Sequence, residues 1–181
     1  DMIVGGTRIL TPGEVDRLME VMERPSDRVI FDALLFSGVR YAELSQVAKE
    51  PSRFNPERKC LTIDNKKDKA AERAGDTRVV YLSDRGVEAV RAFIALGKTP
   101  CHYNQWLRKL KRWSHVAGLK PLDGLEDGTT REQLVQEKVP NVWGISVKST
   151  RKTLECWLFC AFPDRADLIA DSMGHSVEVS R

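Results

Sequence analysis

The sequence predicts one α+β domain that is mainly α-helical and carries a small antiparallel β-sheet. Apolar residues recur at helical spacing in several segments that begin at capping residues and end at glycine or proline. Two β-branched segments, residues 59–63 and 78–82, flank a polar stretch as the arms of a hairpin do. The chain has 181 residues, 41% of them hydrophobic, which is enough for one domain with a core.

Proline marks the starts of the first two predicted helices. Thr11 and Glu14 have the spacing of a capping box, with Pro12 at the first helical position. Pro25 begins a second helix, whose mostly apolar residues continue until Gly38 ends it. The sequence therefore predicts two helices in succession.

A third helix is predicted directly after Gly38. Arg40 stands at its start, and Glu43 follows one turn later, where its carboxylate can brace the guanidinium. An ordinary exposed pair at this spacing stabilises a helix by only about 0.2–0.5 kcal/mol. The position directly after a tight glycine turn favours a functional role for Arg40.

The tip of the predicted hairpin is rich in lysine. Lys66, Lys67 and Lys69 lie in the sequence DNKKDK, residues 64–69. A lysine-rich tip can reach a phosphate or a minor groove. Lysines also occur in solvated turns and prevent strand edges from pairing with other chains. The spacing alone leaves both interpretations open.

A helix capped by Ser83 or Asp84 precedes an amphipathic helix over residues 104–117. We expect Trp106 and Trp113 to lie in the core rather than to stack on bases. The opposite face of the second helix is basic, and either contacts a DNA backbone or is simply solvated. Its candidate DNA-binding residues are Arg108, Lys109 and Arg112.

Residues 120–144 are rich in glycine, aspartate and glutamate and predict a long connection. One helical turn is expected near residues 133–137. A further helix, capped by Ser149 or Thr150, then continues until Pro163 stops it.

The end of the chain predicts an anion site. Lys148 and Arg151 lie one helical turn apart, so both cationic groups can point to one place. A short helix, residues 164–173, ends at Gly174, which can turn His175 toward the same place. On these residues alone a solvated helix turn is the more common arrangement, whereas the upstream arginine motif favours the anion site.

Composition narrows the classes of partner. The net charge is +3, and clustering of basic residues decides nucleic-acid binding more than the total does. The four cysteines show no C-x-x-C pair, which predicts reduced thiols in an intracellular protein. Cys156 and Cys160 have a spacing that a zinc site could share, but such thiols are usually buried hydrophobes. No metal or cofactor is predicted, and no apolar run approaches the roughly 20 residues of a membrane span.

Four separated segments together resemble the tyrosine recombinase (phage integrase) family. They stand in the family's order over almost the whole chain. Residues 37–44, SGVRYAEL, resemble Thr-Gly-Leu-Arg-x-x-Glu-Leu; residues 148–153, KSTRKT, resemble His-x-x-Arg-His-Thr; and residues 173–176, MGHS, resemble Leu-Gly-His-Ser. The family's hairpin lysine falls at Lys67, with Lys66 as the alternative.

This resemblance implies that residues 1–181 form a catalytic domain that cuts and rejoins DNA. In the family a tyrosine attacks a phosphodiester and forms a 3′-phosphotyrosine, without metal or cofactor. Two arginines bind the non-bridging oxygens, and the hairpin lysine protonates the leaving 5′-oxygen. The implied catalytic residues are Arg40, Lys67, Lys148, Arg151 and His175.

The chain departs from the family pattern in two ways. Lys148 replaces the usual histidine, as in integrases of archaeal viruses and plasmids. The nucleophilic tyrosine is expected shortly after Arg181, because Tyr41, Tyr81 and Tyr103 stand elsewhere in the pattern. We therefore expect the family's N-terminal core-binding domain and its nucleophile-bearing tail to lie outside this chain.

The implied partner is double-stranded DNA at attachment sites, bound by a tetramer in the cytoplasm of a host cell, for integration of a viral or other mobile element. The domain alone is expected to be a monomer, with no membrane association. Three alternatives remain: a non-catalytic DNA-binding protein with the same fold, a type IB topoisomerase, and a helical adaptor whose basic residues are all solvated.

Overall fold

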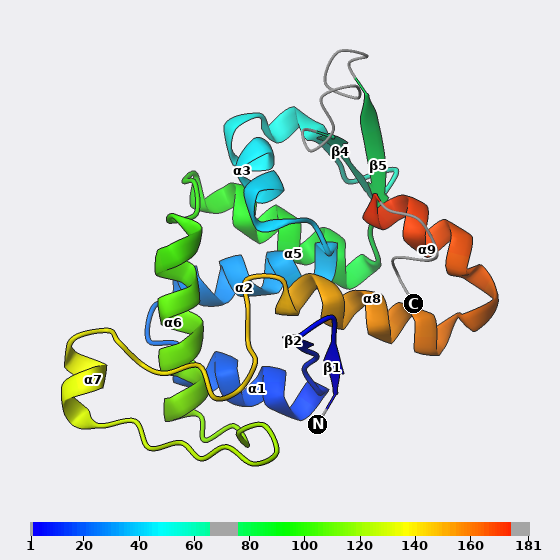
Figure 1. Cartoon of the computed structure of the whole chain (residues 1–181). Helices are drawn as coiled ribbons and strands as arrows, with labels where there is room; N and C mark the ends of the chain where they lie inside the picture. The colour runs from blue at the N-terminus through cyan, green and yellow to red at the C-terminus, as the bar shows by residue number, and fades with distance from the viewer. Residues whose placement is uncertain (1, 66–75, 175–181) are drawn as a thin grey trace.

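The computed structural model describes residues 2–65 and 76–174 and has the predicted α+β architecture (Figure 1). Helix α2 (Pro25–Ser37) is central, because it packs against both α5 (Asp84–Leu96) and α8 (Ser149–Ala161). Phe31 and Leu34 on α2 are completely buried. The α2 helix therefore forms the middle of the hydrophobic core.

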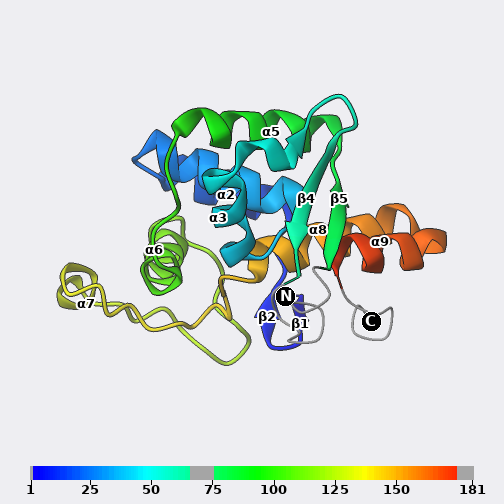
Figure 2. The same ribbon diagram turned by 90° about the horizontal axis from the view of Figure 1, so that it is seen from above.

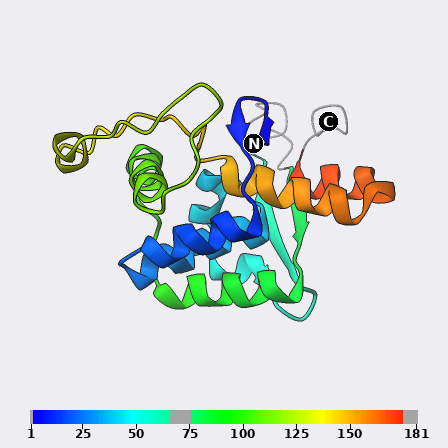
Figure 3. The same cartoon turned by 90° about the horizontal axis from the view of Figure 1, so that it is seen from below.

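The remaining helices, apart from α7, lie around this centre (Figures 1 and 3). The capping box of Thr11 and Glu14 is confirmed, as is the left-handed turn at Gly38 that ends α2. None of the helices within the described ranges is long and apolar enough to cross a membrane. Besides α2, α5 and α8, the helices are α1 (Pro12–Val21), α3 (Tyr41–Lys49), α6 (Tyr103–Val116), α7 (Arg131–Val135), α9 (Ala166–Met173) and the 3-10 helices η1 (Pro51–Arg53) and η2 (Pro163–Arg165).

The predicted hairpin is the antiparallel pair β4 (Cys60–Asp64) and β5 (Thr77–Tyr81). Leu61 pairs with Val80 and Ile63 with Arg78, so these side chains share the buried face of the sheet. The sequence did not predict three further strand pieces, because strands of two residues are too short to show an alternating pattern. They are β3 (Phe54–Asn55), which pairs with β4, and the separate hairpin β1 (Ile3–Val4) and β2 (Thr7–Arg8).

Helix α6 confirms the expected role of the tryptophans. Trp106 and Trp113 are buried, with ring centroids 5.3 Å apart in an edge-to-face arrangement. The long connection after α6 carries α7, which begins at Arg131, two residues before the predicted turn. In all three views α7 lies at the outer end of this connection, away from the main helical body (Figures 1, 2 and 3).

The start of α8 differs from the prediction. Neither Ser149 nor Thr150 caps the helix, because α8 begins at Ser149 and Lys148 occupies the cap position. The Ser149 hydroxyl instead accepts a 3.0 Å hydrogen bond from the backbone N–H of Ser146, outside the helix. The shift places Lys148 before the first helical turn and Arg151 within it.

Candidate active site

The ends of α2, α3, α8 and α9 meet at one place beside strand β5. Gly38 has a φ of 69° and lies so close to α8 and α9 that an added Cβ would be 2.8 Å from Leu154 Cδ2 and 3.0 Å from Met173 Cε. Arg40 caps α3 two residues later. Chain segments far apart in sequence thus bring Arg40 and Arg151 together, as the two arginine motifs predicted.

Arg151 is held by the ends of two helices. Its Nη1 donates a 2.8 Å hydrogen bond to the carbonyl of Gly38, and its Nη2 donates to the carbonyl of Met173. Carbonyls at helix C-termini carry partial negative charge and favour a cation. A guanidinium has five N–H groups, so three of them have no partner in the part of the chain that the structure describes.

The charge on Arg151 is maintained in a crowded cationic environment. Burial lowers the pKa of Arg151 to about 10, and the positive charges of Arg40 and Arg78 contribute to the shift. This value still leaves the guanidinium protonated at neutral pH. Arg40, Arg78 and Arg151 form an arginine cluster. This cluster is suited to an anion, because an anion would relieve the repulsion between the three positive charges.

Glu43 neutralises part of this charge and orients its neighbours. One carboxylate oxygen accepts a 2.8 Å hydrogen bond from the backbone N–H of Arg40, and the other lies 3.3 Å from Arg40 Nη1. The same carboxylate binds Arg78, with 2.7 Å between Oε1 and Nη2. The predicted brace between Glu43 and Arg40 is therefore confirmed, and it is shared with a second arginine.

Arg78 is the member of this arginine cluster that the sequence reasoning missed. Its side chain is only 6% exposed, although it belongs to a strand. Besides Glu43, its Nε donates to the carbonyl of Ser172 at 3.2 Å, and its Nη1 donates to Asn65 Oδ1 at 3.1 Å. One signal was present in the sequence: Arg78 alternates with Val80 on the inward face, where a charged residue needs a partner.

Four of the predicted site residues, Lys66, Lys67, Lys69 and His175, lie outside the described residues. The described segments that lead to them nevertheless meet at Arg78. Asn65 precedes the lysine segment and accepts the Arg78 hydrogen bond, while Gly174 precedes His175 and packs on the Arg78 side chain. An added Cβ at Gly174, whose φ is 76°, would be 2.9 Å from Arg78 Cδ.

Lys148 lies at the cap of α8, less than one turn before Arg151. Its side chain is exposed and has no ion-pair or hydrogen-bond partner within residues 2–65 and 76–174. Its backbone N–H donates a 3.1 Å hydrogen bond to Ser146 Oγ, which holds this turn in place. Lys148 is thus close to Arg151 in the sequence, but among the described residues no hydrogen bond or ion pair joins its side chain to the arginines.

Tyr41 lies next to the arginine cluster in the sequence, but its hydroxyl group is bound elsewhere. Tyr41 follows Arg40, but its hydroxyl donates a 2.5 Å hydrogen bond to the carbonyl of Cys101 and its ring stacks on Trp106. Burial raises the pKa of Tyr41, and the hydrogen bond to Cys101 adds to the shift, which disfavours a phenolate nucleophile.

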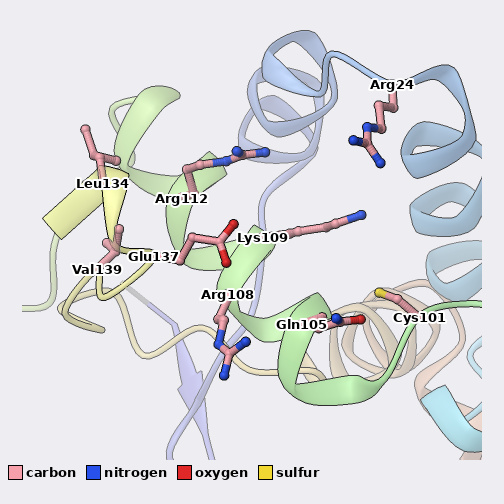
Figure 4. Close-up of a pocket in the computed structure, with 9 residues that line it drawn as sticks. All are labelled: Arg24, Cys101, Gln105, Arg108, Lys109, Arg112, Leu134, Glu137 and Val139. Atoms are coloured by element: carbon pink, nitrogen blue, oxygen red, sulfur yellow. The ribbon is translucent and has the colours of Figure 1, made fainter. Parts of the chain in front are cut away.

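The basic face of α6 lies apart from the arginine cluster and borders a pocket of about 290 Å³ (Figure 4). Arg108 and Arg112 are exposed there. Lys109 is instead partly buried, and its Nζ lies 3.0 Å from Asp27 Oδ1 on α2. The ion pair gives Lys109 a structural role that the sequence did not predict. No group of three potential metal ligands was found among the described residues.

We expect the free energy of unfolding to fall in acid, because Glu43 then loses its charge. Burial raises the pKa of Glu43, but the hydrogen bond and charge of Arg78 outweigh it and hold the pKa below its ordinary value. A lowered carboxylate pKa stabilises the fold above the unfolded-state value of 4.5 and loses that contribution as pH falls toward the folded-state value. Denaturant unfolding between about pH 6 and pH 3 should show a smaller acid-induced loss of unfolding free energy in Glu43→Gln than in the natural chain. Equal losses in both proteins would contradict this assignment.

Comparison with known proteins gives similarity of structure rather than of sequence. No protein-family model matches the chain, and no curated protein sequence matches it. The crystal structure of XerA recombinase matches with a TM-score of 0.65 at 16% identity, covering 99% of this chain and 59% of that one. The crystal structure of XerH site-specific recombinase, bound to palindromic difH substrate in a post-cleavage complex, also matches. The TM-score is 0.62 at 17% identity, and the match covers 96% of this chain and 48% of that one.

A pre-cleavage complex of XerH with difH substrate gives the same TM-score of 0.62, at 18% identity. The chain spans between 48% and 59% of the length of these recombinases. At this level of identity the likeness establishes the architecture. The chain therefore has the α+β fold of a tyrosine recombinase catalytic domain.

Proposed function

We propose that this chain is the catalytic domain of a site-specific DNA recombinase that cuts and rejoins DNA through a 3′-phosphotyrosine. The observation that carries the proposal is the convergence of Arg40 and Arg151 at the meeting point of four helix ends, beside the buried Glu43–Arg78 pair. The similarity of fold to XerA and XerH supports the same class of enzyme.

The arginines suit the charge that develops during phosphoryl transfer. Attack of a tyrosine oxygen on the phosphorus gives a trigonal-bipyramidal transition state with added charge on the non-bridging oxygens. Arg40 and Arg151 would donate hydrogen bonds to those oxygens, and planar guanidinium groups do this in pairs. Their positive charge supplies the electrostatic stabilisation that a divalent cation supplies in other phosphoryl transfers.

The remaining roles follow from the chemistry of the side chains. Lys67, or Lys66 in its place, would protonate the leaving 5′-oxygen as the P–O bond breaks. His175 would donate to a non-bridging oxygen or accept the proton of the attacking tyrosine. Lys148 would add a donor, but an ammonium cannot accept a proton, so the base role would fall to His175. We place the nucleophilic tyrosine after Arg181.

The proposed partner is double-stranded DNA at paired attachment sites, bound as a tetramer, with the isolated domain a monomer. The Lys-x-x-Arg pattern further leads us to propose an integrase of an archaeal virus, a plasmid or a similar mobile element. Binding by this domain would depend on phosphate contacts made by Arg40, Arg151 and the predicted residues Lys69, Arg108 and Arg112. Its affinity should therefore be weak and should fall steeply with salt.

The decisive experiment uses the chain together with any residues that its gene encodes after Arg181. The protein is incubated with a nicked suicide substrate made from the DNA that flanks its own gene, and then analysed on a denaturing gel. A covalent protein–DNA band that forms in the presence of a chelator would support the recombinase. A folded protein that binds this DNA but gives no band would instead support the non-catalytic DNA-binding alternative.

Lys148 provides a separate test of the pocket. Because its side chain is exposed and unpaired among the described residues, Lys148→Met should change the free energy of unfolding by less than about 0.5 kcal/mol. The same change should slow covalent complex formation by about 10²-fold if the ammonium assists the reaction. Lys148→His should retain more activity than Lys148→Met, because imidazole also donates a hydrogen bond. Equal rates for all three proteins would remove Lys148 from the site.

A further inference from the structure

Three sulfur-containing side chains lie together where α8 meets the N-terminal hairpin. The Sγ atom of Cys156 on α8 is 3.4 Å from the Sδ atom of Met2. Cys160 follows one turn later on the same face of α8. Arg151 precedes Cys156 by five residues, so their side chains point about 140° apart around the helix. The sulfur cluster of Met2, Cys156 and Cys160 is therefore separate from the proposed phosphate site.

The fold holds Met2 beside α8. The hairpin β1–β2 lies against this helix (Figures 1 and 3). The backbone N–H of Ile9 donates a 2.9 Å hydrogen bond to the carbonyl of Met2. The next residue, Leu10, donates its N–H to Thr153 Oγ1, also at 2.9 Å. Thr153 lies one turn before Cys156, so two successive hydrogen bonds fix the backbone of Met2 relative to that thiol.

The spacing of the two thiols suits a shared metal ion better than a disulfide. Residues four apart on a helix have Cβ atoms about 5–6 Å apart, whereas a disulfide needs about 3.5–4.5 Å. Both cysteines are accordingly free. Burial raises the pKa of Cys156, and the charge and hydrogen bonding of Cys160 raise it further, so the thiols interact across the turn. Sulfur ligands about 2.3 Å from one ion lie about 4 Å from each other, close to the 3.4 Å between Cys156 and Met2.

The set of ligands indicates which metal fits. Thiolate and thioether sulfurs are soft ligands, and the thioether favours Cu(I). A structural zinc site instead takes four ligands from cysteine, histidine and carboxylate side chains. The part of the chain that the structure describes holds no metal-binding group of even three such side chains. We infer that Met2, Cys156 and Cys160 bind one Cu(I) ion. The ligands are thiolates, so binding releases the two thiol protons to solvent.

The first test is an anaerobic titration of the reduced protein against the coloured complex of Cu(I) with bicinchoninate. The natural chain should withdraw one Cu(I) per molecule, measured as loss of the colour of the complex. Cys156→Ser/Cys160→Ser should withdraw none. The matched control, Cys60→Ser/Cys101→Ser, removes two partly buried thiols elsewhere and should bind as the natural chain does. Circular dichroism would verify that both double variants fold.

Met2 offers a test of the third ligand. Met2→Leu keeps an apolar side chain of similar size at a position that is 53% exposed, and removes only the sulfur atom. Loss of a group that merely supports a ligand costs about 10- to 100-fold in metal affinity, so loss of the thioether should weaken Cu(I) binding by tenfold or more. The affinity for Zn²⁺, measured with a zinc indicator, should not depend on Met2, because thioethers are not zinc ligands.

Alkylation by iodoacetamide, followed by mass spectrometry, locates the bound ion. Cu(I) should slow labelling of Cys156 and Cys160 by about tenfold or more, because a metal-bound thiolate is not a free nucleophile. Labelling of Cys60 and Cys101 should not change. Failure to withdraw Cu(I), equal binding by Cys156→Ser/Cys160→Ser, or unchanged Cu(I) affinity in Met2→Leu would overturn the inference. None of these measurements needs DNA, so they succeed or fail independently of the proposed recombinase activity.

Discussion

Arg151→Lys should reduce the rate of DNA cleavage by about 10²- to 10³-fold, although the positive charge is kept. Arg151 donates two of its N–H groups to the carbonyls of Gly38 and Met173. Its three other N–H groups can bind a phosphate. A lysine ammonium has three N–H groups in all and cannot reach both carbonyls and a phosphate in one planar arrangement. The measurement is the single-turnover rate of covalent complex formation on a suicide substrate.

This experiment needs a control for folding, because Arg151 also joins α2 to α9. Denaturant unfolding of Arg151→Lys would show whether the variant remains folded under the assay conditions. Arg165→Lys is the matched control, since it makes the same change at an exposed position in η2 and should leave the rate unaltered. A folded Arg151→Lys protein that cleaves at the natural rate would exclude Arg151 from the proposed phosphate site.

Arg78→Met should destabilise the fold by about 3–5 kcal/mol. The change removes the main partner of Glu43 and leaves a nearly buried carboxylate with the 2.8 Å hydrogen bond from the Arg40 backbone N–H and the longer 3.3 Å contact to the Arg40 guanidinium. It also removes the hydrogen bonds to Ser172 and Asn65, which lie before the two segments that carry the predicted His175 and lysines. Urea unfolding of the isolated domain measures the loss directly.

A double-mutant cycle separates the Glu43–Arg78 pair from other effects of the substitution. Arg78→Met combined with Glu43→Gln removes the stranded charge, so the double variant should be more stable than the sum of the two single losses indicates, by about 1–3 kcal/mol. Arg85→Met breaks the more exposed pair with Asp32 and should cost less than about 1 kcal/mol. Additive losses at positions 43 and 78 would show that the buried pair does not stabilise the cluster.

The sequence by itself determined the parts of this protein that depend on local patterns. Helical periodicity and capping residues predicted the helices, and the alternation of residues 59–63 and 78–82 predicted the hairpin. Arg40 and Glu43 were predicted as a pair, since their contact is set by one turn of helix. The similarity to known family motifs also predicted, from the sequence alone, that Arg40 and Arg151 belong to one catalytic site.

Only the tertiary structure decided the contacts between distant segments. Arg78 and Glu43 are 35 residues apart, and Arg151 lies 113 residues from the Gly38 carbonyl that it binds. The ion pair of Lys109 with Asp27 crosses 82 residues in the same way. Periodicity specifies which face of an element is buried, but the partner of a buried charge depends on how the elements pack. Packing therefore decided which basic residues became structural and which remained available for a phosphate.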